Sequence, residues 1–201
     1  MIVIDGVVGV GKSTLMNILS DKYNLTPYKE PVFNNILLEK FYYNRERYSF
    51  PLQIFFFNKR LEQLKEAATK KNTILDRSIY GDLIFAKLLK DNNEMSEEEY
   101  DVYLDLFNNM VEHIPTPKLL IYLDISVDNA IDRIHKRGRD FELITEKSYW
   151  EKLNKNYTSF FNDYSYSKIL KINVNDLDFE NNSDDKAYVI SLIDDVLSTI
   201  V

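Results

Sequence analysis

The chain has 201 residues, no cysteine and a net charge of −7, with 45% hydrophobic and 28% charged residues. This composition is that of a folded globular protein and the length suits one domain over residues 1–201, while disulfides and thiolate metal sites are excluded. The longest apolar runs fall short of the roughly 20 residues that cross a membrane. A protein with a net charge of −7 also lacks the excess of cations that binding to nucleic acid needs, so we expect a cytoplasmic protein that binds neither membrane nor nucleic acid.

The chain begins with a phosphate-binding loop. The apolar run 2–4 predicts a buried strand, the segment 12–23 predicts a helix, and the sequence between them fits the pattern G-x-x-x-x-G-K-[S/T]. In such a loop backbone N–H groups, a lysine and a helix N-terminus together hold a polyphosphate, and the serine hydroxyl binds Mg²⁺. The residues expected to contact the phosphates are Gly6, Val7, Val8, Gly9, Val10, Gly11, Lys12, Ser13 and Thr14.

Strand and helix patterns alternate along the rest of the chain. Further strands are predicted at 25–29, 72–75, 119–123 and 168–174, and helices near 33–44, 49–70, 80–92, 97–114, 127–137, 146–163 and 184–199. This alternation predicts an α/β fold, with a five-stranded parallel sheet covered by helices on both faces. Ligands of such sheets bind beyond the carboxyl ends of the strands. The polar segment Asn175 to Asp185 is interpreted as a solvated surface loop.

Charged residues follow three of the predicted strands. Asp76 ends a buried strand, where it can hold Mg²⁺ beside Ser13, and Arg77 places a cation in the same space, although a structural ion pair is the alternative. Asp124 is a rival metal position that would serve equally well as a helix cap. Glu30 follows another strand and could orient a hydroxyl group and take its proton, or it could be an exposed residue in a turn.

The helix predicted at 49–70 carries a row of recognition residues. Gln53, Phe56 and Arg60 are spaced by three and four positions and therefore share one face. An amide, an aromatic ring and a guanidinium can read a flat heterocycle, since glutamine both donates to and accepts from one base edge. Without further context, Gln53 and Arg60 could equally be surface residues.

Four cations lie close together near the end of the helix predicted at 127–137. They are Arg133, Lys136, Arg137 and Arg139. A loop of this kind can close over transferring phosphates, neutralise their charge and exclude water. Enrichment of cations at a helix C-terminus is the alternative, and it accounts for two of them better than for four.

In this order the motifs resemble the deoxyribonucleoside kinases, in the branch that includes deoxyadenosine, deoxyguanosine and deoxycytidine kinases. The resemblance covers nearly the whole chain. Its motifs are the phosphate loop, Glu30-Pro31-Val32, Tyr42, Glu46-Arg47-Tyr48-Ser49-Phe50, Gln53, Asp76-Arg77-Ser78-Ile79-Tyr80 and Arg137-Gly138-Arg139.

The resemblance implies a P-loop kinase, commonly a homodimer, that uses ATP and Mg²⁺ to phosphorylate the 5′-hydroxyl of a purine deoxynucleoside, deoxyadenosine first. Glu30 matches the general base, Arg77 the arginine beside the reacting groups, and Lys12 the phosphate-binding lysine. The remaining positions match as follows: Ser13 and Asp76 for the metal, Tyr42 and Glu142 for the sugar 3′-hydroxyl, Gln53, Arg60 and Asp82 for the base, Phe56 and Phe85 for the substrate pocket, and Arg133, Arg137 and Arg139 for the lid over ATP.

The chain departs from the family pattern at two places. Asp76 stands where many members carry glutamate, and the stretch between Asp82 and the Phe85-Ala86 pair is one residue short.

A nucleoside-monophosphate kinase of the thymidylate type is the first rival function, since it shares the phosphate loop, the Asp-Arg pair and an arginine lid. A GTP-binding switch protein is the second rival, and the chain has no Asn-Lys-x-Asp motif to read guanine.

Overall fold

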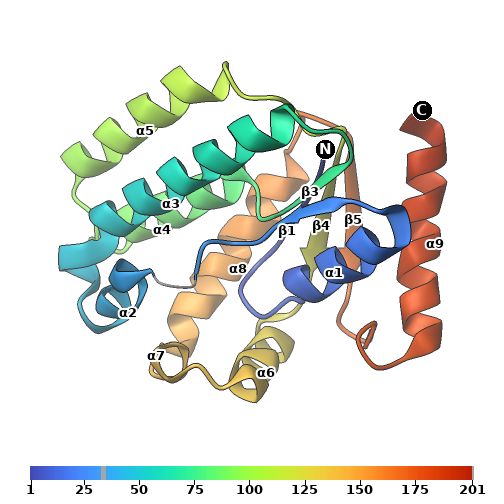
Figure 1. The fold of residues 1–201 in the computed structure, drawn as a ribbon. Helices are drawn as coiled ribbons and strands as arrows, with labels where there is room; N and C mark the ends of the chain where they lie inside the picture. Colours follow the sequence, from blue (N-terminus) through green and yellow to red (C-terminus); the bar gives the residue numbers. More distant parts are fainter. Residues whose placement is uncertain (33–34, 201) are drawn as a thin grey trace.

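The computed structural model describes residues 1–32 and 35–200, and its centre is a parallel sheet in the order β2-β3-β1-β4-β5 (Figure 1). Every neighbouring pair of strands in this sheet is parallel. The strands are β1 (Ile2–Asp5), β2 (Thr26–Tyr28), β3 (Thr73–Asp76), β4 (Leu119–Asp124) and β5 (Ile169–Asn173). The α/β fold with a five-stranded parallel sheet is therefore confirmed.

Helices cover the sheet on both sides, with α1 and α9 on one side and α4 and α8 on the other (Figure 1). The helices are α1 (Lys12–Tyr23), α2 (Ile36–Tyr43), α3 (Arg45–Ala68), α4 (Ile79–Asp91), α5 (Glu97–Val111), α6 (Val127–Arg137), α7 (Asp140–Leu143), α8 (Lys147–Asn162) and α9 (Ser183–Ile200). The first two positions of the helix predicted at 33–44 lie outside the described residues. None of the described helices combines the length and the apolar character needed to cross a membrane.

The start of one helix and the presence of one short helix are the main differences from the predicted helices. Helix α3 begins at Arg45, four residues before the predicted start, because the Asn44 side chain accepts a hydrogen bond from the Arg47 N–H and caps it there. Pro51 consequently lies inside the helix and does not open it. The short helix α7 was not predicted, since it has only four residues and no apolar period.

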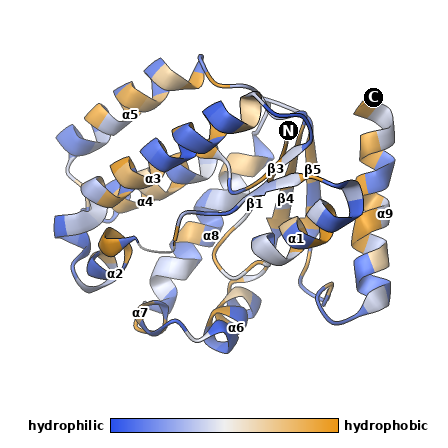
Figure 2. Ribbon diagram, in the orientation of Figure 1, coloured by the Kyte–Doolittle hydropathy of each residue, from blue (hydrophilic) through white to orange (hydrophobic). Residues whose placement is uncertain are grey.

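The central strands are apolar on both faces, and their carboxyl ends meet at one edge of the sheet. Strands β1 and β3 are buried along their whole length, as is typical of strands covered by helices on both sides. The surrounding helices alternate between hydrophilic and hydrophobic positions (Figure 2). The register pairs Ile4 with Asp76 and Tyr28 with Leu75, so β1, β2 and β3 end at one edge of the sheet. The residues that follow these strands therefore meet beside the phosphate loop.

Candidate active site

The phosphate loop wraps around the ammonium group of Lys12. Its Nζ donates hydrogen bonds to the carbonyl oxygens of Gly6 at 3.0 Å and Val7 at 2.9 Å. Gly6 has a φ of 148°, and a Cβ atom there would lie 2.6 Å from the Leu123 carbonyl oxygen. Burial, together with the nearby Arg77 cation, lowers the pKa of Lys12 to about 8. The cradle thus holds a cation in a desolvated place, where an anionic ligand would stabilise its charge.

Ser13 and Asp76 provide the oxygen atoms of a candidate metal site. The Ser13 hydroxyl donates to Asp76 Oδ2 at 2.5 Å, and Asp76 Oδ1 is buried without a hydrogen-bond partner among the described residues. Burial raises the pKa of Asp76 and the Lys12 charge opposes that shift. A hydroxyl and an unsatisfied carboxylate fit Mg²⁺, which binds few protein ligands and takes the rest from phosphates and water. Accordingly, residues 1–32 and 35–200 contain no cluster of three acidic or histidine ligands.

Glu30 and Arg77 form an ion pair that lines the same cleft. Arg77 Nε donates to Glu30 Oε1, and Arg60 Nη2 lies 3.9 Å from the same oxygen. Burial acts to raise the pKa of Glu30, but the charges of Arg77, Lys12 and Arg60 outweigh it and hold this pKa at about 2. The side chain is only 22% exposed and lines the cleft, so the interpretation of Glu30 as an exposed turn residue is wrong.

The low pKa of Glu30 predicts how stability depends on acid. A carboxyl group whose pKa falls on folding stabilises the protein fully above its unfolded pKa of 4.5, and this contribution disappears as the pH falls toward 2. We therefore expect the difference in unfolding free energy between the wild type and Glu30→Gln to shrink by about 2 kcal/mol from pH 6 to pH 3. Urea titrations at both pH values measure it. A difference that stays constant with pH contradicts the low pKa.

One wall of the cleft contains most of the predicted recognition residues. The cleft has a volume of about 920 Å³, and this wall is formed by Tyr42, Gln53, Phe56, Asp82 and Phe85. Gln53 is buried, so the alternative of a surface position is wrong. An amide among three aromatic rings can grip and orient a planar base.

Arg60 is fully buried, and it lies behind this wall rather than in it. Its Nε donates to Asp82 Oδ2 at 3.3 Å and its Nη1 donates to the Asp76 carbonyl oxygen at 2.8 Å. Burial raises the pKa of Asp82 although Arg60 opposes this. The expected Arg60–Asp82 pair thus exists despite the shortened stretch after Asp82, and only Asp82 of the two lines the cleft.

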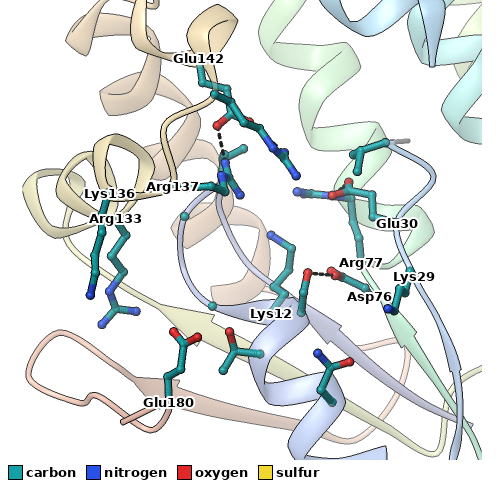
Figure 3. A pocket seen from close by; sticks show the side chains of 18 of the residues that line it. Lys12, Lys29, Glu30, Asp76, Arg77, Arg133, Lys136, Arg137, Glu142 and Glu180 are labelled. Carbon is teal, nitrogen blue, oxygen red and sulfur yellow. Dashed lines mark hydrogen bonds and ion pairs between the residues drawn. The ribbon is translucent and has the colours of Figure 1, made fainter. Parts of the chain in front are cut away.

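The lid arginines converge on Glu142. Arg137 Nη2 donates to Glu142 Oε2 at 2.5 Å and Arg139 Nη1 donates to Oε1 at 3.2 Å. Glu142 lies on α7, next to Phe141, whose ring is 5.1 Å from that of Tyr42. Figure 3 shows Lys12 between this lid and the Glu30–Arg77 pair. The carboxylate expected to hold the sugar hydroxyl therefore also contacts the lid.

The segment 175–185 is mostly exposed, as expected of a solvated surface loop, but it also forms part of the cleft. Phe179 is buried against the phosphate loop, where a Cβ on Gly11 would lie 2.8 Å from the ring. Arg133 connects this segment to the phosphate loop, because it donates hydrogen bonds to the carbonyl oxygens of Val10, Val174 and Leu177 at 3.0, 2.9 and 3.1 Å. Residues 175–181 therefore line the cleft, together with Lys136. The single phenylalanine among acidic residues was the signal for this contact.

Asp5 does not line the cleft, but it supports two segments that do, and it was not predicted from the sequence. Its carboxylate is fully buried and accepts hydrogen bonds from the N–H groups of Gly6 at 2.7 Å and Ser78 at 2.9 Å, and from the Ser78 hydroxyl. It thereby joins the phosphate loop to the turn that carries Arg77. An acid between the first strand and the first glycine was the available signal. The rival metal position Asp124 is not among the residues that line the cleft.

One cleft is surrounded by a phosphate loop, a hydrogen-bonded serine–aspartate pair and a carboxylate–arginine pair. Together these define a phosphotransferase with the P-loop kinase fold. The deoxynucleoside kinase sequence profile matches residues 2–198, and the chain belongs to this family of ATP-dependent kinases.

Curated relatives agree with this assignment. A deoxyadenosine kinase of Lactobacillus acidophilus is 37% identical over the whole of this chain and 97% of its own length. A deoxyadenosine/deoxycytidine kinase of Bacillus subtilis is 38% identical over the whole chain and 93% of its own length. The family resemblance is therefore confirmed, and these matches do not favour the monophosphate-kinase alternative.

Solved structures agree as well. Deoxyadenosine kinase from M. mycoides with the products dCMP and dCDP is 36% identical, with a TM-score of 0.87 over 98% of both chains. The same enzyme with bound dATP gives a TM-score of 0.86 at 35% identity, over 96% of this chain and 98% of the other.

Proposed function

We propose that this kinase transfers the γ-phosphoryl group of ATP to the 5′-hydroxyl of a purine deoxynucleoside, with deoxyadenosine as its preferred acceptor. The observation that carries the proposal is the position of Glu30. Its side chain lines the same cleft as the phosphate loop and accepts a hydrogen bond from Arg77. A cleft of about 920 Å³ leaves room for a nucleoside and a nucleoside triphosphate together.

Glu30 is the group that receives the acceptor hydroxyl. With a pKa of about 2 it is ionised at neutral pH and accepts a hydrogen bond from the 5′-hydroxyl. So weak a base takes the proton late, when the oxygen has already begun to bond to phosphorus. This suits the loose transition state of phosphoryl transfer, in which positioning and charge stabilisation supply most of the catalysis.

The donor occupies the phosphate loop. The loop residues Gly6 to Thr14 and the Lys12 ammonium hold the β- and γ-phosphates, and Arg137 and Arg139 close over them from the lid. Ser13 and Asp76 would hold Mg²⁺, which would supply positive charge beside the phosphates. Arg133 acts on the same side by fixing the residues that surround the donor.

The acceptor lies between α3, α4 and the lid. Gln53 and Asp82 read the base edge, with Arg60 supporting Asp82 from behind, and Phe56 and Phe85 hold the base plane. Tyr42 and Glu142 hold the sugar 3′-hydroxyl. The solved M. mycoides deoxyadenosine kinase binds both adenine and cytosine nucleotides, which supports a pocket for amino-substituted bases. One kinase domain over residues 1–201, a homodimer and a cytoplasmic location stay predictions.

An acceptor panel tests the proposed function. The protein is incubated with Mg-ATP and, separately, deoxyadenosine, deoxyguanosine, deoxycytidine, thymidine, dAMP or dTMP, and the products are separated by chromatography. We expect monophosphates from the nucleosides, with the highest kcat/KM for deoxyadenosine, and no diphosphate from dAMP or dTMP. Faster phosphorylation of a nucleotide than of any nucleoside contradicts the function, and a different preferred nucleoside contradicts only the base assignment.

A further inference from the structure

Arg77 is held in an unusual backbone conformation at the centre of the site. Its φ is 78°, in the left-handed region that residues other than glycine seldom adopt. Two contacts keep this turn in place: the Arg77 N–H donates to the Ile4 carbonyl oxygen at 2.8 Å, and Asp5 accepts from the Ser78 N–H at 2.9 Å. The backbone thus aims the Arg77 side chain into the cleft, but it does not by itself fix the orientation of the guanidinium plane.

Tyr157 on α8 contacts that guanidinium from behind. Its side chain is fully buried, its hydroxyl accepts a hydrogen bond from Arg77 Nη1, and it is not among the residues that line the cleft. The rings of Phe85 and Tyr157 lie 5.1 and 5.9 Å from Arg77 Cζ. On the side away from Glu30, the guanidinium plane is therefore held by two rings and one directed hydrogen bond.

The donors of Arg77 are divided between different partners. Nε donates to Glu30 and Nη1 to Tyr157, and no described residue accepts a hydrogen bond from Nη2. We propose that Tyr157 is a positioning residue for phosphoryl transfer: its hydroxyl holds Nη1 so that Nε stays on Glu30 and Nη2 is left for the transferring phosphoryl group. This inference rests on the proposed function and adds a residue to its machinery.

The surroundings of the Tyr157 hydroxyl leave it little freedom. A Cβ atom on Gly81 would lie 3.0 Å from this hydroxyl and 2.9 Å from Asp5 Oδ2, so the two side chains fill the space that Gly81 leaves open. Arg77 Nη1 is 3.8 Å from Asp5 Oδ1. Without the Tyr157 hydroxyl, Nη1 is drawn toward the Asp5 carboxylate, and this movement rotates the guanidinium away from Glu30.

The test replaces only the hydroxyl group. Tyr157→Phe keeps the ring and its packing, and we expect kcat to fall about tenfold to a hundredfold, as for a lost hydrogen bond to a charged group that orients reacting atoms. The KM values for the deoxynucleoside and for ATP are expected to change by less than about threefold, because the binding contacts stay intact. Steady-state kinetics with both substrates varied give these values, and a thermal melt confirms folding.

The matched control is Tyr164→Phe, which removes the hydroxyl group of another buried tyrosine in the same aromatic cluster. That hydroxyl pairs with Ser167 at 2.7 Å and does not contact Arg77. Its kcat should stay within twofold of the wild type. Equal losses in the two variants would mean that general packing, and not positioning of Arg77, explains the effect.

A double-mutant cycle with Arg77→Lys gives the decisive comparison. If Tyr157 acts through Arg77, Tyr157→Phe has no further effect on kcat in the Arg77→Lys background. An undiminished loss in that background, or a wild-type kcat for Tyr157→Phe alone, overturns the proposal; if Arg77→Lys is too slow to measure, the single variant decides. All ratios are measured with whichever nucleoside the wild type phosphorylates, so an incorrect assignment of deoxyadenosine leaves this test intact.

Discussion

Glu30→Gln is expected to lower kcat by about 10²- to 10⁴-fold while ATP still binds with near wild-type affinity. Glutamine keeps the size of the side chain but cannot take the proton of the 5′-hydroxyl. The phosphate loop, with Lys12 bonded to the Gly6 and Val7 carbonyl oxygens, does not depend on Glu30. Single-turnover phosphorylation of deoxyadenosine and equilibrium titration with ATP measure the two effects separately.

The control for this experiment is Glu39→Gln, which makes the same chemical change at an exposed position on α2. It should leave both kcat and ATP affinity unchanged. A Glu30→Gln enzyme with undiminished kcat removes Glu30 as the base. A loss of ATP binding in the same variant would instead show that the Glu30–Arg77 pair organises the donor side of the cleft.

The sequence predicted the parts of the site that follow directly from strand ends. In a parallel sheet every carboxyl end lies at one edge, so a buried strand followed by Asp76-Arg77 had to place these residues near the phosphate loop. The 2.5 Å contact between Ser13 and Asp76 follows from that rule and from the register of β1 with β3. The prediction for Glu30 depended on this rule together with the family resemblance, because the residue pattern alone also allowed an exposed position in a turn.

The contacts that were missed join segments far apart in the chain. Phe179 packs on Gly11 although the two residues lie far apart in the sequence. No local sequence pattern predicts such a contact. Arg133 was expected on the phosphates, but it bonds three backbone carbonyl oxygens that only the folded chain brings together. Arg60 was placed on the correct helix face, although its depth behind the wall depends on Asp82 and on the chain after β3.

The largest stability effect is expected at the buried Arg60–Asp82 pair. Asp82→Ala leaves the Arg60 guanidinium fully buried without its carboxylate, and its Nη2 already lacks a hydrogen-bond partner among the described residues. We expect the free energy of unfolding to fall by about 3–5 kcal/mol. Urea unfolding followed by circular dichroism at pH 7 measures it. The control, Asp91→Ala, breaks the exposed Lys87–Asp91 pair on the same helix and should cost only about 0.3–0.5 kcal/mol.

Replacing both partners separates the role of this pair in stability from its role in function. Burial raises the pKa of Asp82 even beside Arg60, so desolvation outweighs the attraction from the side of the carboxylate. The double variant Arg60→Leu with Asp82→Leu should therefore regain most of the stability lost in Asp82→Ala, because neither side chain of the pair then leaves a buried charge without its partner. It should not regain discrimination among deoxynucleosides, because Asp82 lines the cleft at the base. Recovery of both properties would mean that the pair does not read the base, whereas recovery of stability alone assigns the pair to substrate recognition.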